Sequence, residues 1–250
     1  VMPLVKQIWA YEESGVHSLA AAIVKDRYPR EALTTALRIL GEGQLSLSKV
    51  LMVTDQDCDA KDFKTLFTII LERIDFARDL FVLSNISQDT LDYTGPKVNE
   101  GSKAIFLGLG DKIRDLPREF SRSLTQNCFK KASVFCPGAL AVTGPSYQKG
   151  DGIPELLTQD KAIQEWPMVF LLDDATEATK SSEDFIWHVF TRFEPAADVY
   201  AKNLFTKRFH TGLTPPVVID CRMKPWYPKV LESDPSVSKR LEPLFGKHRI

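Results

Sequence analysis

Hydrophobic residues along this chain form two kinds of run, and the two kinds alternate. Short, almost wholly apolar runs are typical of strands buried in a sheet, and they occur at 19–24, 50–53, 80–83, 104–107 and 217–219. Between them, apolar positions spaced three, four and seven residues apart predict amphipathic helices over 31–40 and 62–74. The alternation predicts an α/β fold with one or more mainly parallel sheets flanked by helices.

The pattern changes in the second half of the chain. Two short apolar pieces, at 133–135 and 140–142, are separated by the turn residues Pro137 and Gly138. The tail from Pro225 onward is rich in proline, lysine and glutamate, and its spacing predicts one helix near 237–244.

One pattern of strand, acidic turn and helix occurs twice, with a constant offset of 119 positions. The matching pairs are Asp55 with Asp174, Arg73 with Arg192, Asp75 with Glu194, and Asp79 with Asp198. A repeat of this kind predicts two related α/β units in tandem, which we place at 1–123 and 124–250. The motif at the helix end is more complete in the second unit, so we expect the first to be the degenerate copy.

Composition narrows the classes of function. The 32 basic and 33 acidic residues nearly cancel, and no basic cluster stands out, which argues against a nucleic-acid partner. No apolar run is long enough for a membrane span, and the start does not resemble a signal peptide, so we expect a cytoplasmic protein. The four cysteines lack CxxC spacing, and we expect reduced thiols. Because the chain begins Val1-Met2-Pro3 within apparently structured sequence, we expect it to be part of a longer protein.

The acidic turn after the run at 50–53 invites a metal hypothesis. Asp55, Asp57 and Asp59 do not fit a calcium loop, because that loop needs glycine and glutamate where this chain has Ala60 and Leu66. A magnesium-dependent phosphoryl- or glycosyl-transfer site stays open, because carboxylates at the carboxyl ends of strands lie where α/β proteins bind ligands. It would use Asp55 and Asp57, with Asp173 if the two strands are neighbours.

A purely structural interpretation of the same residues competes with the metal hypothesis. Asp57 or Asp59 would cap the helix that follows by accepting backbone N–H bonds. Each helix-end arginine, Arg73 or Arg192, would pair with a distant carboxylate and fix the turn into the next strand. The four histidines are scattered, and no glycine-rich phosphate loop is present, so the residues alone indicate no assembled active site.

These residues resemble the C-terminal region of the UbiD-type decarboxylase family. The first unit supplies Tyr28-Pro29, Lys49, the run from Val50 to Asp57, the helix end from Arg73 to Asp79, Leu91-Asp92-Tyr93 and Gly101-Ser102-Lys103. The second unit supplies Trp187, the signature from Thr191 to Asp198, and the segment from Val217 through Asp220 to Lys224. The two-copy form resembles most the branch assigned to menaquinone synthesis.

The resemblance implies a carboxy-lyase that removes CO₂ from a small aromatic acid in menaquinone or ubiquinone biosynthesis. It further implies a prenylated flavin mononucleotide with a divalent metal and potassium, and a preceding part that carries the family's catalytic arginine and glutamates. We therefore assign no catalytic or metal residue here and leave the cofactor-binding residues open. We expect the chain alone to be inactive and to bind no cofactor. The motif positions expected to be structural, or to form a wall of the active site, are Asp174, Arg192, Glu194, Asp198, Asp220 and Lys224.

Departures from the family pattern concentrate in the first unit. A family lysine falls near Leu33, the signature proline is replaced by Phe76, and Asp-Ala-Thr has become Gly108-Leu109-Gly110. We expect the domain to self-associate, because Phe185, Trp187 and Phe193 offer more apolar surface than one helix face needs. The alternatives are a stand-alone structural or interaction module and the magnesium-dependent transferase described above.

Overall fold

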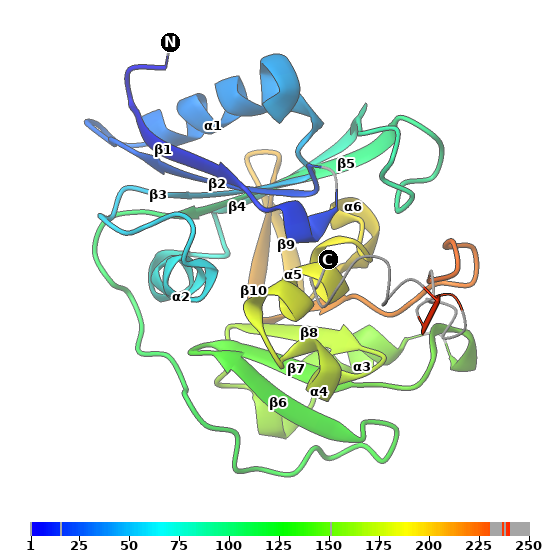
Figure 1. The fold of residues 1–250 in the computed structure, drawn as a ribbon. Coiled ribbons are helices and arrows are strands. Elements are labelled where there is room, and N and C mark those ends of the chain that lie inside the picture. Colours follow the sequence, from blue (N-terminus) through cyan, green and yellow to red (C-terminus); the bar gives the residue numbers. More distant parts are fainter. Residues whose placement is uncertain (1, 16, 151, 231–236, 238, 241–250) are drawn as a thin grey trace.

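Two five-stranded sheets lie one above the other, with helices between them and on their outer faces (Figure 1). The computed structural model describes residues 2–15, 17–150, 152–230, 237, 239 and 240. The helix predicted near 237–244 therefore falls mostly outside the described residues. None of the helices in the described part of the chain combines the length and the apolar character that crossing a membrane requires.

The two sheets share one strand order. The first is ordered β1-β2-β3-β5-β4, with β1 Val5–Ala10, β2 Leu19–Val24, β3 Val50–Thr54, β4 Leu80–Ser87 and β5 Glu100–Gly108. The second is ordered β6-β7-β8-β10-β9, with β6 Lys131–Cys136, β7 Ala139–Thr143, β8 Met168–Leu172, β9 Val199–Lys207 and β10 His210–Asp220. All five apolar runs of the sequence are strands, and the repeated order supports the repeated motif.

Both sheets are mixed, which corrects the expectation of mainly parallel sheets. The three central strands of each sheet are parallel, whereas both edge strands run antiparallel to their neighbours. The central strands are buried on both faces and give continuous apolar runs, while β9 is largely exposed and gives no such run. The prediction of mainly parallel sheets was wrong because the sequence did not show that the edge strands run antiparallel.

Helices cover both faces of each sheet. They are α1 Glu31–Gly41, α2 Phe63–Arg73, α3 Ile153–Thr158, α4 Ala175–Ala178, α5 Ser182–Phe190 and α6 Pro195–Asp198. Four short 3₁₀ segments complete the described helices, at Glu12–Ser14, Gly43–Leu47, Tyr147–Lys149 and Lys161–Ile163. Helix α1 packs on the outer face of the first sheet, α3 packs on the outer face of the second, and α2 and α5 lie between the sheets (Figure 1).

The layer between the sheets is one shared core of aromatic rings. Phe63 of α2 packs against Phe135 of β6, and Phe135 stacks on Phe185 of α5 with 3.6 Å between ring centroids. Phe185 and Phe193 are completely buried there, which corrects their expected exposure; only Trp187 of that trio is exposed. The two units are therefore joined by a continuous apolar core.

The β9–β10 hairpin ties the second unit to the first. It rises from the lower sheet toward the upper one in Figure 1, and the backbone N–H of Leu213 donates to the carbonyl of Phe76 at 3.0 Å. At Gly212 an added Cβ would lie 2.9 Å from the carbonyl oxygen of Ala77 and closer still to the ring of Phe205. The hairpin can pass this point only because the residue is glycine.

Helix α2 begins with a different aspartate from the two expected. Asp62 is the N-cap, and its Oδ1 accepts from the N–H of Thr65 at 3.2 Å. Asp57 instead pairs with Lys6, and Asp59 accepts from the N–H of Lys61 within the preceding turn. The capping interpretation of the acidic turn is therefore wrong for Asp57 and Asp59.

Candidate functional site

The strand-end carboxylates hold a loop in each sheet. Both oxygens of Asp55 accept from the N–H of Gly110 at 3.1 Å, beyond β5, and Oδ2 of Asp173 accepts from the N–H of Met223 at 2.8 Å, beyond β10. Asp55 therefore corresponds to Asp173 and not to Asp174, whose Oδ1 caps α4 through the N–H groups of Thr176 and Glu177. The offset is 118 positions at the strand end and becomes 119 by the helix end.

The magnesium hypothesis loses its geometric basis. Asp55 follows β3 in the first sheet and Asp173 follows β8 in the second, so the two strands are not neighbours. Asp57 is largely exposed and pairs with Lys6. The residues that the structure describes contain no group of three or more histidine, cysteine, aspartate or glutamate side chains arranged to hold a metal.

The helix-end motif builds the same turn twice. Oδ2 of Asp79 accepts from the N–H of Asp75 at 3.0 Å, and Oδ2 of Asp198 accepts from the N–H of Glu194 at 2.7 Å. Each aspartate also meets a cation, but the cation comes from a different place in each unit. Asp79 pairs with Arg30 beside α1, whereas Asp198 pairs with Lys224 beyond β10.

Lys224 is the centre of a buried group that we call the Lys224 cluster. Its Nζ lies 3.0 Å from Oδ2 of Asp198, and it donates to the carbonyls of Arg192 at 3.1 Å and Asp220 at 3.4 Å. Burial raises the pKa of Asp198, and the nearby ammonium of Lys224 partly opposes that rise. All three acceptors of Lys224 belong to expected motif positions, so its ammonium is fully engaged in holding them together.

Asp220 makes the second ion pair of the cluster. Its carboxylate receives a two-point contact from Arg222, with Nη2 2.7 Å from Oδ2 and Nε 2.8 Å from Oδ1. Both side chains are buried, so this pair belongs to the framework of the second sheet.

Motif residues of the two units also meet each other. The hydroxyl of Ser102 on β5 donates to Oε1 of Glu194 at 2.9 Å and accepts from the N–H of Ala196 at the same distance. Nearby, Lys49 and Asp92 form a buried pair 2.8 Å apart. Burial raises the pKa of Asp92, but the Lys49 ammonium and the hydrogen bonds from Thr94 together lower it by more, so the net pKa lies below the usual value. The motifs thus join the units.

The two helix-end arginines differ in how far the protein satisfies them. Arg73 donates from Nε to the carbonyl of Gly110 at 3.0 Å and from Nη1 to Ile69 at 3.1 Å, and it pairs with Glu72 at 2.9 Å. Among the described residues, Arg192 has one ion pair, between Nη1 and Oδ2 of Asp173 at 3.6 Å. The expected pairing with a distant carboxylate therefore describes Arg192, while Arg73 is held by backbone carbonyls and a sequence neighbour.

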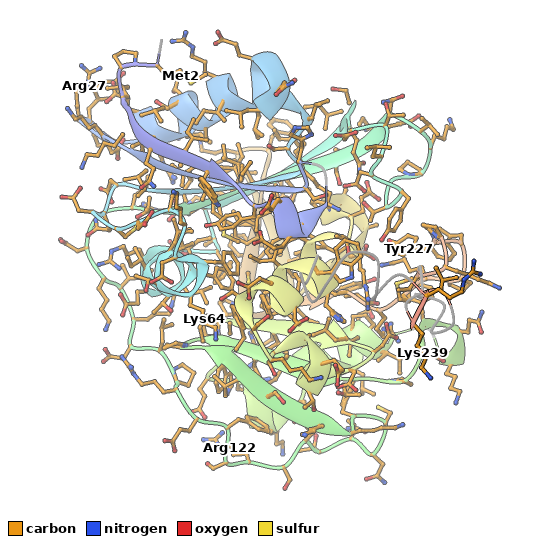
Figure 2. All side chains as sticks on the ribbon, viewed as in Figure 1. Met2, Arg27, Lys64, Arg122, Tyr227 and Lys239 are labelled. Atoms are coloured by element: carbon orange, nitrogen blue, oxygen red, sulfur yellow. The ribbon has the colours of Figure 1, made fainter. Side chains whose placement is uncertain are left out.

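Three cavities lie at the motif positions. One of about 630 Å³ in the first unit is lined by residues that include Tyr28, Asp55, Arg73, Asp75 and Asp79. Two further cavities are lined by residues of both units: Trp187 and Arg192 line one of about 430 Å³, and Glu194, Asp198 and Lys224 line one of about 290 Å³. Figure 2 shows Arg27, which also lines the first cavity, and Tyr227, which contacts the Lys224 cluster, on opposite sides of the molecule.

The structure brings five of the six expected positions into one connected group. Arg192, Glu194, Asp198, Asp220 and Lys224 are joined by the bonds described above, whereas Asp174 caps a separate helix. The partner of Lys49 and the pairing of Ser102 with Glu194 were not predicted. Their only signal in the sequence is a polar residue just before or within an otherwise apolar strand, which requires a buried partner.

Comparison with known proteins points to one family. Residues 1–108 match the family model of the 3-octaprenyl-4-hydroxybenzoate carboxy-lyase C-terminal domain. This match lies in the first unit, although comparison within the chain points to the second as the better-preserved copy.

Longer relatives match almost the whole chain. An uncharacterised protein of Chlamydia trachomatis serovar D is 47% identical over 94% of this chain and 40% of its own length. A Chlamydia pneumoniae protein, named as one of the subunits of 4-hydroxybenzoate decarboxylase, is 44% identical over 96% of this chain and 41% of its own length. The chain thus spans about two fifths of the length of these relatives.

Solved structures overlap only loosely with the chain. The closed form of Sedimentibacter hydroxybenzoicus vanillic acid decarboxylase is 20% identical, covers 62% of this chain and 28% of its own, and has a TM-score of 0.41. At that TM-score the likeness says nothing about function.

Proposed function

We propose that this chain is the C-terminal region of a longer UbiD-type carboxy-lyase that decarboxylates a small aromatic acid. The observation that carries the proposal is the family match over residues 1–108, together with the relative named as part of a decarboxylase. We further propose that the acid belongs to menaquinone or ubiquinone biosynthesis, that the protein is cytoplasmic, and that the chain comprises two related units, 1–123 and 124–250.

The role proposed for this region is to form the scaffold and to close one wall of the active site. The expected motif residues are engaged in bonds to one another: Lys224 with Asp198, Asp220 with Arg222, and Glu194 with Ser102. Groups held in this way position other parts of the molecule. This supports a catalytic centre located in the rest of the protein.

The cofactor is proposed for that remaining part. Prenylated flavin mononucleotide, with its divalent metal and potassium, would supply the electron sink for decarboxylation. The described residues do not fit these groups: they offer no cluster of metal ligands, and the cations beside the strand ends already have carboxylate or carbonyl partners. We therefore assign no step of the reaction to residues of this chain.

The test compares two proteins. The complete protein, loaded with prenylated flavin and the metal ions, should release CO₂ from 4-hydroxybenzoate or a related hydroxyaryl acid. The 250-residue chain, treated identically, should stay colourless and release none, because the flavin and the groups that carry out the reaction lie elsewhere. A complete protein that folds, binds flavin and decarboxylates none of a panel of aromatic acids would overturn the proposal.

Self-association is proposed from the exposed apolar side chains of the β9–β10 hairpin. Leu204, Phe205 and Phe209 are exposed, and Phe209 at the tip is completely so. Apolar side chains gathered on one projecting hairpin favour burial against another protein surface. Light scattering of the chain at micromolar concentration should show a dimer or larger assembly, and replacing Phe209 with serine should shift it toward monomer. A strict monomer would exclude this role.

A further inference from the structure

The cavity beside Arg192 combines apolar walls with an incompletely satisfied cation. It has a volume of about 430 Å³ and is lined by the rings of Tyr93 and Trp187 and by the side chains of Met223 and Arg192. We refer to it as the Trp187 pocket. Its volume lies toward the lower end of the usual range for small-molecule sites, roughly 300–1,000 Å³, so it suits a ligand of one or two rings.

Two cations line this pocket: Lys229 is exposed and has no ion pair with the described residues, whereas Arg192 is buried and lacks a full set of partners. Its side chain is only 10% exposed, yet its one pairing among the described residues is the 3.6 Å contact with Asp173, which is beyond hydrogen-bond distance. No Arg192 nitrogen is among the buried, unpaired polar atoms of the described residues, so the unpaired N–H groups are open to solvent. A carboxylate can replace that water with two parallel acceptors.

The first unit provides an internal comparison. Arg73, which occupies the corresponding helix end, donates to two backbone carbonyls and pairs with Glu72. The same motif position is thus satisfied by the protein in one unit and left open toward a cavity in the other. The difference marks Arg192 as available to a ligand.

The walls of the pocket favour a flat, apolar body behind the anion. Trp187 is 45% exposed on α5, and Tyr93 packs edge to face against Tyr227 with 5.0 Å between ring centroids. Indole, phenol and thioether surfaces pack well against an aromatic ring. Next to Arg192, burial and that cation lower the pKa of His188 to about 4, so the histidine is neutral near pH 7 and adds no competing charge.

We propose that the Trp187 pocket binds a small aromatic carboxylate, with the carboxylate on Arg192 and the ring between Trp187 and Tyr93. The second unit contributes Trp187 and the open arginine, which has no open counterpart in the first unit, and the first unit contributes Tyr93. Only the choice of the acid used to test it rests on the function proposed above.

The test titrates the 250-residue chain with 4-hydroxybenzoate by calorimetry and follows the indole N–H signal of Trp187 by NMR. We expect saturable binding with a dissociation constant of about 1 mM or tighter and a shift confined to Trp187 among the four tryptophans. The neutral analogue 4-hydroxybenzamide should bind at least about tenfold more weakly, because it lacks the charge that Arg192 recognises.

Variants separate the pocket from general effects. Arg192→Gln should weaken binding at least about tenfold, while the matched Arg73→Gln in the first unit should leave the affinity unchanged. Trp187→Leu, at a half-exposed position that folding tolerates, should weaken binding even if Arg192→Gln proves unstable. The proposal would be overturned if binding did not saturate by a 4-hydroxybenzoate concentration of about 10 mM, or if the wild type and Trp187→Leu bound the acid with equal affinity.

The outcome is independent of the decarboxylation assay. If the chain binds the acid but the complete protein has no decarboxylase activity, the proposed function is wrong and the proposed binding site stands. If the complete protein is active but the isolated chain binds no acid, only the proposed binding site is wrong.

Discussion

Lys224 and Asp198 form a buried ion pair, with Nζ 3.0 Å from Oδ2 and each side chain only 4% exposed. The pair joins the loop after β10 to the end of α6, and the same ammonium holds the carbonyl of Arg192. It therefore fixes the turn that carries the helix-end motif of the second unit.

Breaking this pair from one side should destabilise the fold strongly. Lys224→Met leaves the Asp198 carboxylate buried without its cation, and it should lower the free energy of unfolding by about 3–5 kcal/mol. Asp198→Asn should also destabilise, and the double variant should lose less than the sum of the two single losses. Urea denaturation of the four proteins measures this coupling. Strictly additive losses would show that the two side chains do not interact.

Stability should depend on pH through His188. Burial, and then the charge of Arg192, lower the pKa of His188 from 6.5 to about 4. Between those pH values the unfolded chain binds a proton that the folded chain does not, so stability should rise as pH increases from about 4 to 6.5. His188→Gln should remove about 1–3 kcal/mol of that rise, relative to the wild type. Parallel stability curves for the two proteins would contradict the assignment.

The aspartate that caps α2 can be identified by substitution. Asp62→Ala removes the acceptor for the N–H of Thr65 and should cost about 1 kcal/mol of stability. The matched control Asp57→Ala removes only the exposed pair with Lys6 and should leave stability essentially unchanged. Thermal unfolding of both variants distinguishes the two positions. A larger loss of stability in Asp57→Ala than in Asp62→Ala would show that Asp57 is the helix cap.

The shared core predicts that the two units unfold together. Phe185 of the second unit packs against Phe63 of the first, and Phe185→Ala should cost about 3–5 kcal/mol. Signals from Trp9 in the first sheet and Trp166 in the second unit should then move through a single transition, at a lower denaturant concentration than in the wild type. Two separate transitions would mean that each unit is stable alone.

The central strands were predictable, whereas the edges of the sheets were not. Runs such as Val50–Thr54 and Met168–Leu172 are buried on both faces, so nearly every residue is apolar. The β9–β10 turn consists of Arg208 and Phe209, both at positive φ, although glycine and asparagine are the usual signals for such a turn. With no turn signal and an exposed strand, the sequence offered little sign of the antiparallel edge.

The sequence named the members of the Lys224 cluster as motif positions but not their connections. The repeat picked out Arg192, Glu194 and Asp198, which lie close together along the chain. It matched Asp55 with Asp174, where the structure matches it with Asp173, because a one-residue difference between strand end and helix end shifts the alignment. The partners of Lys49 and Ser102 come from distant segments, which no local pattern specifies.

The hydrogen bond from Leu213 to Phe76 and the close packing at Gly212 attach the two units to each other independently of the chain segment that links them. The β9–β10 hairpin of the second unit packs against the first unit. Phenylalanine rings from both units also pack together in the core between the sheets. A protease cut in the irregular stretch 109–130 would consequently sever the polypeptide without releasing either piece. A substitution that changes the shape of one unit at this contact therefore requires a matching substitution in the other unit.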